Sequence, residues 1–232
     1  MCYSYKSLLL IVLGGLLLAG GMQSCRDGKR YHESVTADIP EPASRGLASI
    51  RAFQEELNGE FRDPEISPLS PEQIGGFPGL DFFEPDTTYQ VMAQLVRTPG
   101  ALPFEMPTTT DRMALERTYG ILRFELQGRP FELEVYQSPD LMMQEGFEDY
   151  LFLPFTDATN GKETYEGGRY IDLRIPAGDS ILLDFNTAYN PYCAYNPKYS
   201  CPIVPSVNDL DIPVYAGVRA YRKSQAPLRQ SP

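Results

Sequence analysis

The chain has 232 residues, of which 20 are Lys or Arg and 31 are Asp or Glu, so its formal net charge is -11. Nucleic acid is not expected as a partner, because binding to phosphates needs a basic surface. Hydrophobic residues at 42% and charged residues at 22% exclude a low-complexity or fully disordered chain.

Residues 1–24 have the pattern of a lipoprotein signal peptide. Lys6 precedes the apolar run Leu8–Ala19, which is too short for a membrane span. The segment Met22–Cys25 is similar to the bacterial lipoprotein cleavage box, in which the Cys becomes the lipid-modified N-terminus. We therefore expect Cys25 to carry lipid and to anchor the protein to a bilayer of the cell envelope, on its periplasmic or cell-surface side. An ordinary cleaved signal or an uncleaved anchor is the alternative.

The rest of the chain divides into a tether, one domain and a tail. Residues 25–43 are polar and include two Pro, which is typical of a flexible tether. The only His, His32, lies in this tether, so the domain is expected to contain none. Residues 44–222 are expected to form a single β-rich domain, and residues 223–232 a disordered tail.

The domain begins with a predicted amphipathic helix over residues 44–61. Leu47, Ile50 and Leu57 recur at helical spacing, with Ser44 as the expected N-cap and Gly59 as the expected end. We expect this helix to pack on the sheet, and a partner-binding helix is the alternative.

From Thr87 onward the hydrophobic period changes from 3.6 to 2, which predicts strands. The segments 120–127 and 131–135 flank a Gln-Gly-Arg-Pro break and predict a hairpin. The fold class is therefore mainly β, a compact antiparallel β-barrel or sandwich with a flanking N-terminal helix, because runs this close leave no room for crossover helices. Further strands are predicted at 150–156, 169–175, 180–186 and 212–221.

Polar residues are densest in two blocks, 155–170 and 183–202. Arg169 is the expected anchor for an anionic group, through its two-pronged guanidinium, and the Tyr side chains suit the wall of a pocket. We predict that the two blocks meet in one accessible pocket for a small polar or anionic ligand. The candidate ligand-binding residues are Asp157, Thr159, Glu163, Tyr165, Arg169, Asp184, Asn186, Tyr189 and Asn190.

Two cysteines, Cys193 and Cys201, remain in the domain. In an exported, oxidising compartment such a pair indicates a short-loop disulfide, and two buried free thiols are the alternative.

Other site chemistries have less support in the sequence. A domain without His excludes zinc sites of the His type and triads that use His, and two thiols are too few for a closed zinc site. No metal or cofactor is expected. Activation of Cys193 by Arg169 as a nucleophile stays open, as does a pair of carboxylates among Asp157, Glu163 and Asp184.

These alternatives leave three functional hypotheses. The first is a tethered lipoprotein that binds a small ligand or an envelope partner, and the second is a His-independent hydrolase acting on envelope material. The third is a structural envelope protein, in which the polar residues form hydrogen-bonded networks within the fold.

The blocks FLPFTDATNGKETYEGGRYIDL and LDFNTAYNPYCAYNPKYSCP resemble the bacterial domain of unknown function family 1684. ISPL at 66–69, FPGLDFF at 77–83 and AGVRAY at 216–221 extend the resemblance over most of the mature chain. Val204 and Val207 stand where the family pattern has Pro and Glu. The resemblance implies no activity, because the family has no known function.

Overall fold

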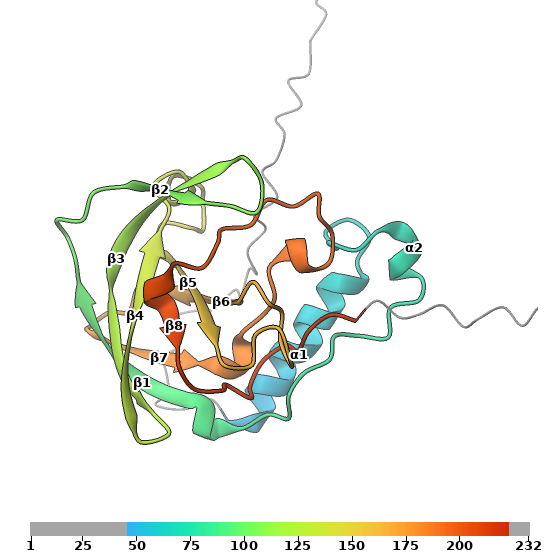
Figure 1. The fold of residues 1–232 in the computed structure, drawn as a ribbon, viewed down its shortest axis with the longest axis horizontal. Coiled ribbons are helices and arrows are strands. Elements are labelled where there is room, and N and C mark those ends of the chain that lie inside the picture. Colours follow the sequence, from blue (N-terminus) through green and yellow to red (C-terminus); the bar gives the residue numbers. More distant parts are fainter. Residues whose placement is uncertain (1–45, 223–232) are drawn as a thin grey trace, which may run out of the picture.

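The computed structural model describes residues 46–222 (Figure 1). The expected signal peptide, the lipidation site Cys25, the tether and the C-terminal tail lie outside the described residues. Within residues 46–222, no helix combines the length and the apolar character needed to cross a membrane.

The core of the fold is one sheet that curls into a half-barrel, with helix α1 beside it (Figure 1). The strand order is β6-β5-β4-β3-β1-β7, while β2 pairs with β3 and β8 pairs with β5. All pairs are antiparallel except β5 with β8. The predicted mainly β class with antiparallel pairing and an N-terminal helix is therefore confirmed. The strands are β1 (Gln90–Arg97), β2 (Phe104–Pro107), β3 (Met113–Leu126), β4 (Arg129–Gln137), β5 (Tyr150–Asp157), β6 (Arg169–Arg174), β7 (Ser180–Asp184) and β8 (Asp209–Leu210).

The β3–β4 hairpin forms where the sequence predicts it. Gln127 and Gly128 both have positive φ, 53° and 74°, which is the geometry of the two-residue turns that match the strand twist. Phe124 then lies opposite Phe131, so the apolar residues of the two strands share one face.

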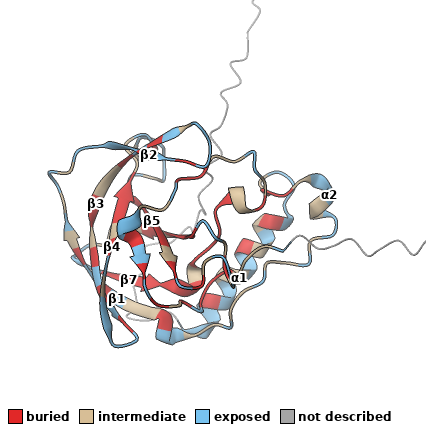
Figure 2. Ribbon diagram, in the orientation of Figure 1, coloured by how far each residue is buried: buried red, intermediate tan, exposed pale blue. Residues whose placement is uncertain are grey.

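A bulge in β3 changes which of its alternate side chains point to each face of the sheet. The register shifts between Thr118 and Gly120. As a result Ala114 belongs to one buried cluster and Leu122 to the other, although both are even-numbered residues of the same strand. Both faces of the sheet are therefore covered, and Figure 2 shows that burial extends over most strands.

Helix α1 (Leu47–Arg62) packs through Ile50, Leu57 and Phe61. The observed helix differs from the predicted one in three respects. The N-cap is Gly46, Gly59 lies inside the helix, and Leu47 is 47% exposed instead of facing the core. The remaining helices are short: α2 (Pro71–Ile74), η1 (Thr87–Tyr89), η2 (Leu141–Met143), η3 (Phe185–Thr187), η4 (Tyr192–Ala194) and η5 (Ser206–Asn208).

The strand predicted at 212–221 is wrong, since that segment is irregular apart from one bridge between Phe82 and Val218. Its backbone is held by side chains instead of by a neighbouring strand. Val214 donates its N–H to Asp157, and the carbonyls of Val214 and Ala216 accept from Arg169.

Candidate functional site

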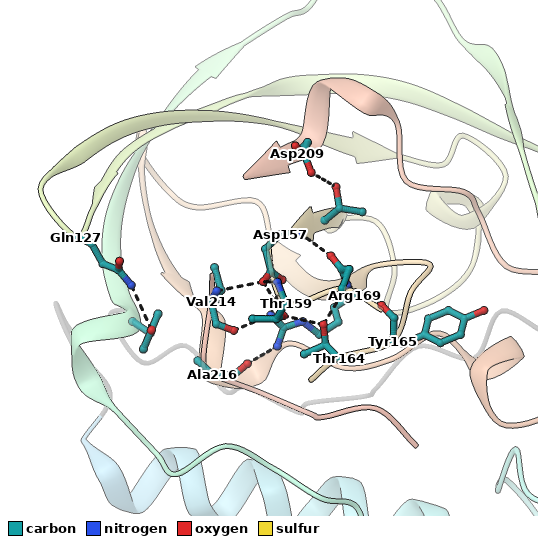
Figure 3. A network of polar contacts seen from close by, with 12 residues as sticks. Gln127, Asp157, Thr159, Thr164, Tyr165, Arg169, Asp209, Val214 and Ala216 are labelled. Carbon is teal, nitrogen blue, oxygen red and sulfur yellow. Dashed lines mark hydrogen bonds and ion pairs between the residues drawn. The ribbon is translucent and has the colours of Figure 1, made fainter. Parts of the chain in front are cut away.

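The first polar block is organised by an ion pair between Asp157, the last residue of β5, and Arg169, the first residue of β6 (Figure 3). Arg169 Nη2 lies 2.7 Å from Asp157 Oδ2, and both side chains are 0% exposed. The same Nη2 donates to the carbonyl of Val214 at 2.9 Å, and Nη1 donates to the carbonyl of Ala216. The guanidinium also lies 5.2 Å from the centre of the Phe155 ring.

The other carboxylate oxygen of Asp157 is also saturated with donors. Oδ1 accepts from the N–H of Thr159 at 2.9 Å, the hydroxyl of Thr159 at 2.6 Å and the N–H of Val214 at 3.1 Å. Burial lowers the pKa of Arg169, and the Asp157 carboxylate opposes this shift. The pair therefore compensates two buried charges and joins the β5–β6 loop to the C-terminal segment.

The β5–β6 loop turns at Asn160 and Gly161, next to this pair. Asn160 Oδ1 accepts the N–H of Asp157 at 2.6 Å, and Nδ2 donates to the carbonyl of Tyr165 at 2.6 Å. Gly161 has φ 76°, a conformation that a side chain disfavours. The hydroxyls of Thr159 and Thr164, 2.7 Å apart, complete the network.

Asp184 and Asn186 belong to a separate network at the end of β7. Asp184 Oδ1 accepts from the N–H and the Nδ2 of Asn186, at 2.9 and 2.8 Å, and Oδ2 accepts from Gln90 at 2.9 Å. Asn186 also exchanges two hydrogen bonds with the backbone of Asp86. The chain leaves the strand at Asp184 and turns into η3, and this local turn brings the two side chains together.

Tyr189 belongs to a third network, centred on Asp172 of β6. The hydroxyls of Tyr189 and Tyr150 both donate to Asp172 Oδ1, at 2.6 and 2.7 Å. Burial and the Asp172 carboxylate raise the pKa of both tyrosines well above its ordinary value. Asp172 is not among the residues predicted from the sequence, although an acidic residue inside the apolar strand RYIDLR is a signal for it.

The neighbouring residue Asn190 fixes another part of the C-terminal segment. Its Nδ2 donates to the carbonyl of Arg219 at 2.9 Å and to the hydroxyl of Tyr195 at 3.2 Å. Asn190 is buried, so this amide also serves the packing of the domain.

Glu163 and Tyr165 differ from the other candidates because they are only partly buried. Glu163 contacts the C-terminal segment through its carbonyl, which accepts from Ala220 at 2.9 Å. The ring of Tyr165 points away from the buried ion pair (Figure 3), and its hydroxyl lies 3.9 Å from Cys193 Sγ. Tyr165 and Cys193 thus form an accessible contact between the two polar blocks.

Cys193 and Cys201 are free thiols in this structure, Cys193 partly buried and Cys201 buried, and a disulfide between them stays a prediction. Cys193 in η4 donates its N–H to Cys201 Sγ at 3.2 Å. A hydrogen bond with Cys201 lowers the pKa of Cys193 to about 7, although burial opposes the shift. The same contact and burial raise the pKa of Cys201.

The side-chain contacts therefore divide the nine candidate residues among several networks. Arg169 presents no exposed donor to an anionic ligand in this structure, because its guanidinium is fully buried. Asp157 and Asp184 are each held by their own neighbours, in two separate networks. Among residues 46–222, no three His, Cys, Asp or Glu side chains are grouped to hold a metal ion.

Comparisons with known proteins agree with this fold but add no activity. The chain is similar to an uncharacterised protein of Haloarcula marismortui, whose solution structure was solved by NMR, at 34% identity and a TM-score of 0.59. The similarity covers 74% of this chain and 92% of that one. No curated protein matches the chain.

A family profile described as a protein of unknown function, DUF1684, matches residues 75–219, more than half of the chain. The match includes both polar blocks and every strand, and it begins after α1. The chain therefore belongs to the DUF1684 family of proteins of unknown function.

Proposed function

We propose that this protein is a lipid-anchored binding protein of the cell envelope, which takes a small polar ligand at an accessible surface around Tyr165. We call this surface the Tyr165 face and define it as Tyr165, Cys193, Lys198 and Tyr199. The observation that carries the proposal is the contact of Tyr165 with Cys193, which joins the two polar blocks at partly exposed side chains.

The chemistry of the Tyr165 face suits a neutral polar ligand such as a glycan. Tyr192, next to Cys193 in the chain, packs edge-on against Tyr199 at 5.3 Å, and Lys198 lies 4.9 Å from the Tyr199 ring. Aromatic rings with a few polar groups are typical of sugar and small-ligand sites. Arg169 is buried, and the chain carries a net charge of -11, so an anionic ligand has less support than the sequence suggested.

The buried networks support this proposal indirectly, because they hold both blocks in place. Asp157 and Arg169 fix the two ends of the β5–β6 loop that carries Tyr165. A binding side chain is most effective when the residues around it are held by packing and hydrogen bonds.

Ligand-induced shifts in melting temperature over a panel of neutral glycans test the binding proposal. A compound that raises the melting temperature of the protein should fail to do so for Tyr165→Ala. The matched control is Tyr215→Ala, which removes an exposed Tyr whose ring packs on Phe83. No shift with any compound, or a shift that Tyr165→Ala retains, contradicts the proposal.

The membrane anchor is tested separately with Cys25→Ser. The sequence around Cys25 supports lipidation, so this variant should lose the lipid mass and leave the membrane fraction. Retention of Cys25→Ser in the membrane fraction with an unchanged mass contradicts lipidation at this residue.

A structural role in the envelope is the second candidate function. The full burial of the Asp157–Arg169 pair favours it, because these residues stabilise the domain and present nothing to solvent. It becomes the better description if the glycan panel gives no shift and Arg169→Ala changes only the melting temperature.

A further inference from the structure

We propose that Cys193 and Cys201 form a reversible dithiol–disulfide couple, in which Cys193 is the attacking thiol and Cys201 the resolving thiol, and in which a small-molecule or protein disulfide is the oxidant. This redox site shares Cys193 with the Tyr165 face, but its argument does not rest on ligand binding there.

The two sulfur atoms are held within reach of each other. Cys201 Sγ lies 3.2 Å from the backbone nitrogen of Cys193, and Cys193 Sγ is three covalent bonds from that same nitrogen. Rotation of one side chain therefore changes the separation of the sulfur atoms without moving a strand.

The position of Cys201 is fixed by the turn between β2 and β3. Its N–H donates to the Thr109 hydroxyl at 3.1 Å, and its carbonyl accepts the Thr109 N–H at 2.9 Å. The next residue, Pro202, accepts a hydrogen bond from Tyr170. Cys201 is 5% exposed and is therefore shielded from direct attack by a bulky disulfide.

Cys193 has the properties of the attacking thiol. It is partly exposed, and its Sγ contacts the Tyr165 hydroxyl at 3.9 Å. Hydrogen bonds from Cys201 and Tyr165 lower its pKa to about 7, against the effect of burial. The lowered pKa increases the share of thiolate at neutral pH, and the thiolate is the reactive form.

The reaction balances as two thiol–disulfide exchanges. The Cys193 thiolate attacks one sulfur of the oxidant R–S–S–R, forms a mixed disulfide and releases R–S⁻. Cys201 then loses its proton and attacks Cys193 Sγ, which forms the internal disulfide and releases the second R–S⁻. The two cysteines are oxidised by two electrons, and R–S–S–R is reduced to two R–SH after protonation.

Tryptic mapping of the full-length protein tests the proposal directly, because cleavage after Lys198 separates the two cysteines. Cys193 lies in the peptide 175–198 and Cys201 in the peptide 199–219. The protein is equilibrated with mixtures of reduced and oxidised glutathione, alkylated and digested. We expect the two peptides to be joined at high oxidised glutathione and separated again at high reduced glutathione.

Single variants assign the two roles. Cys201→Ser should accumulate a glutathione adduct on Cys193, whereas Cys193→Ser should give no adduct on Cys201. In the unchanged protein, Cys193 should be alkylated before Cys201 at pH 7, and Tyr165→Phe should move the half-maximal pH of Cys193 alkylation upward from about 7. A melting curve for each variant confirms that it is folded.

Three results overturn the proposal. The peptides stay separate at every glutathione ratio, or they stay joined at every ratio, which indicates a permanent structural bridge. Alternatively, Cys201 reacts first in the unchanged protein and carries the adduct in Cys193→Ser.

Discussion

The two ends of the β5–β6 loop and its middle part contrast sharply, although all belong to one polar block of the sequence. Asp157 and Arg169, at the ends, are fully buried and bind each other, Thr159 and the C-terminal segment. Tyr165, in the middle, is only partly buried, and its ring points away from the ion pair (Figure 3). Its hydroxyl lies 3.9 Å from Sγ of Cys193 in the other block. The ion-paired residues at the two ends therefore stabilise the fold, whereas Tyr165 keeps part of its side chain accessible.

This contrast shows that a dense polar block in a sequence can contain both buried residues that stabilise the fold and partly exposed residues. A buried Arg with an ion-pair partner and carbonyl acceptors is a means of fixing irregular backbone. Only the partly exposed residues of the same block can meet a ligand without unfolding. Substitutions in the buried set and in the partly exposed set test whether this division is real.

The largest effect is expected from Arg169→Ala, which leaves the Asp157 carboxylate buried without its cationic partner. We expect a loss of about 3–5 kcal/mol in the free energy of unfolding, measured by urea denaturation. The control is Arg123→Ala, which breaks an exposed ion pair with Glu132 and should cost less than about 1 kcal/mol. If Arg169→Ala is too unstable to measure, Arg169→Lys serves in its place, because one ammonium cannot satisfy two carbonyls and a carboxylate in the same geometry. Equal losses for the Arg169 and Arg123 variants would falsify the structural role of the buried pair.

The second effect concerns the irregular segment that Arg169 binds. Gly217 has φ +79°, and a Cβ there would lie 2.9 Å from the Phe185 carbonyl oxygen. We expect Gly217→Ala to reduce the free energy of unfolding by about 2 kcal/mol, through the disfavoured backbone conformation and the overlap. Gly178→Ala is the control, because a Cβ there meets nothing within 4 Å, and its effect should stay within about 0.5 kcal/mol. A neutral Gly217→Ala would show that this segment moves freely.

The third effect is a pH dependence of the free energy of unfolding that a buried Tyr causes and an exposed Tyr does not. The pKa of Tyr189 is raised in the folded protein by burial and by Asp172, above the value of about 10 in an unfolded chain. The unfolded chain therefore loses this proton first, so the stability is fully present below pH 10 and falls as the pH rises further. Tyr189→Phe should make the fall of the free energy of unfolding with pH shallower, by about 0.7 kcal/mol per pH unit at pH 10 and by about 1.3 kcal/mol per pH unit at pH 11.5. Denaturation curves over this range measure it, with Tyr215→Phe as the control. An unchanged slope in Tyr189→Phe contradicts a protonated, buried Tyr189.

Much of the sheet could be predicted from the sequence, because alternation and turn residues are local signals. The β3–β4 hairpin follows from the apolar alternation on both sides of Gln127-Gly128. The segment 212–221 resembles a strand in sequence because its apolar residues line the core. No strand forms there because its backbone binds the side chains of Asp157 and Arg169. That pairing joins residues more than 40 positions apart, and no local pattern encodes it.

The burial of the candidate residues could not be predicted for the same reason. Asp172 and Tyr170 share one face of β6, opposite Ile171. Period-2 alternation assigns that face to solvent, yet the residues around Tyr189 and Tyr192 cover it. A sheet that is covered on both faces turns outward polar residues into buried ones, and this covering is a property of the tertiary fold.

The smallest effect on stability is expected for Tyr165→Ala, and it completes the comparison with Arg169→Ala. Tyr165 is partly exposed, and its hydroxyl lies as far as 3.9 Å from Cys193 Sγ, so its removal should cost about 1 kcal/mol or less in urea denaturation. A large loss would place Tyr165 with the buried networks, and the Tyr165 face would then lose its independence from the scaffold. A small loss, together with a lost glycan response, would show that the fold and the binding surface are carried by different residues of the same loop.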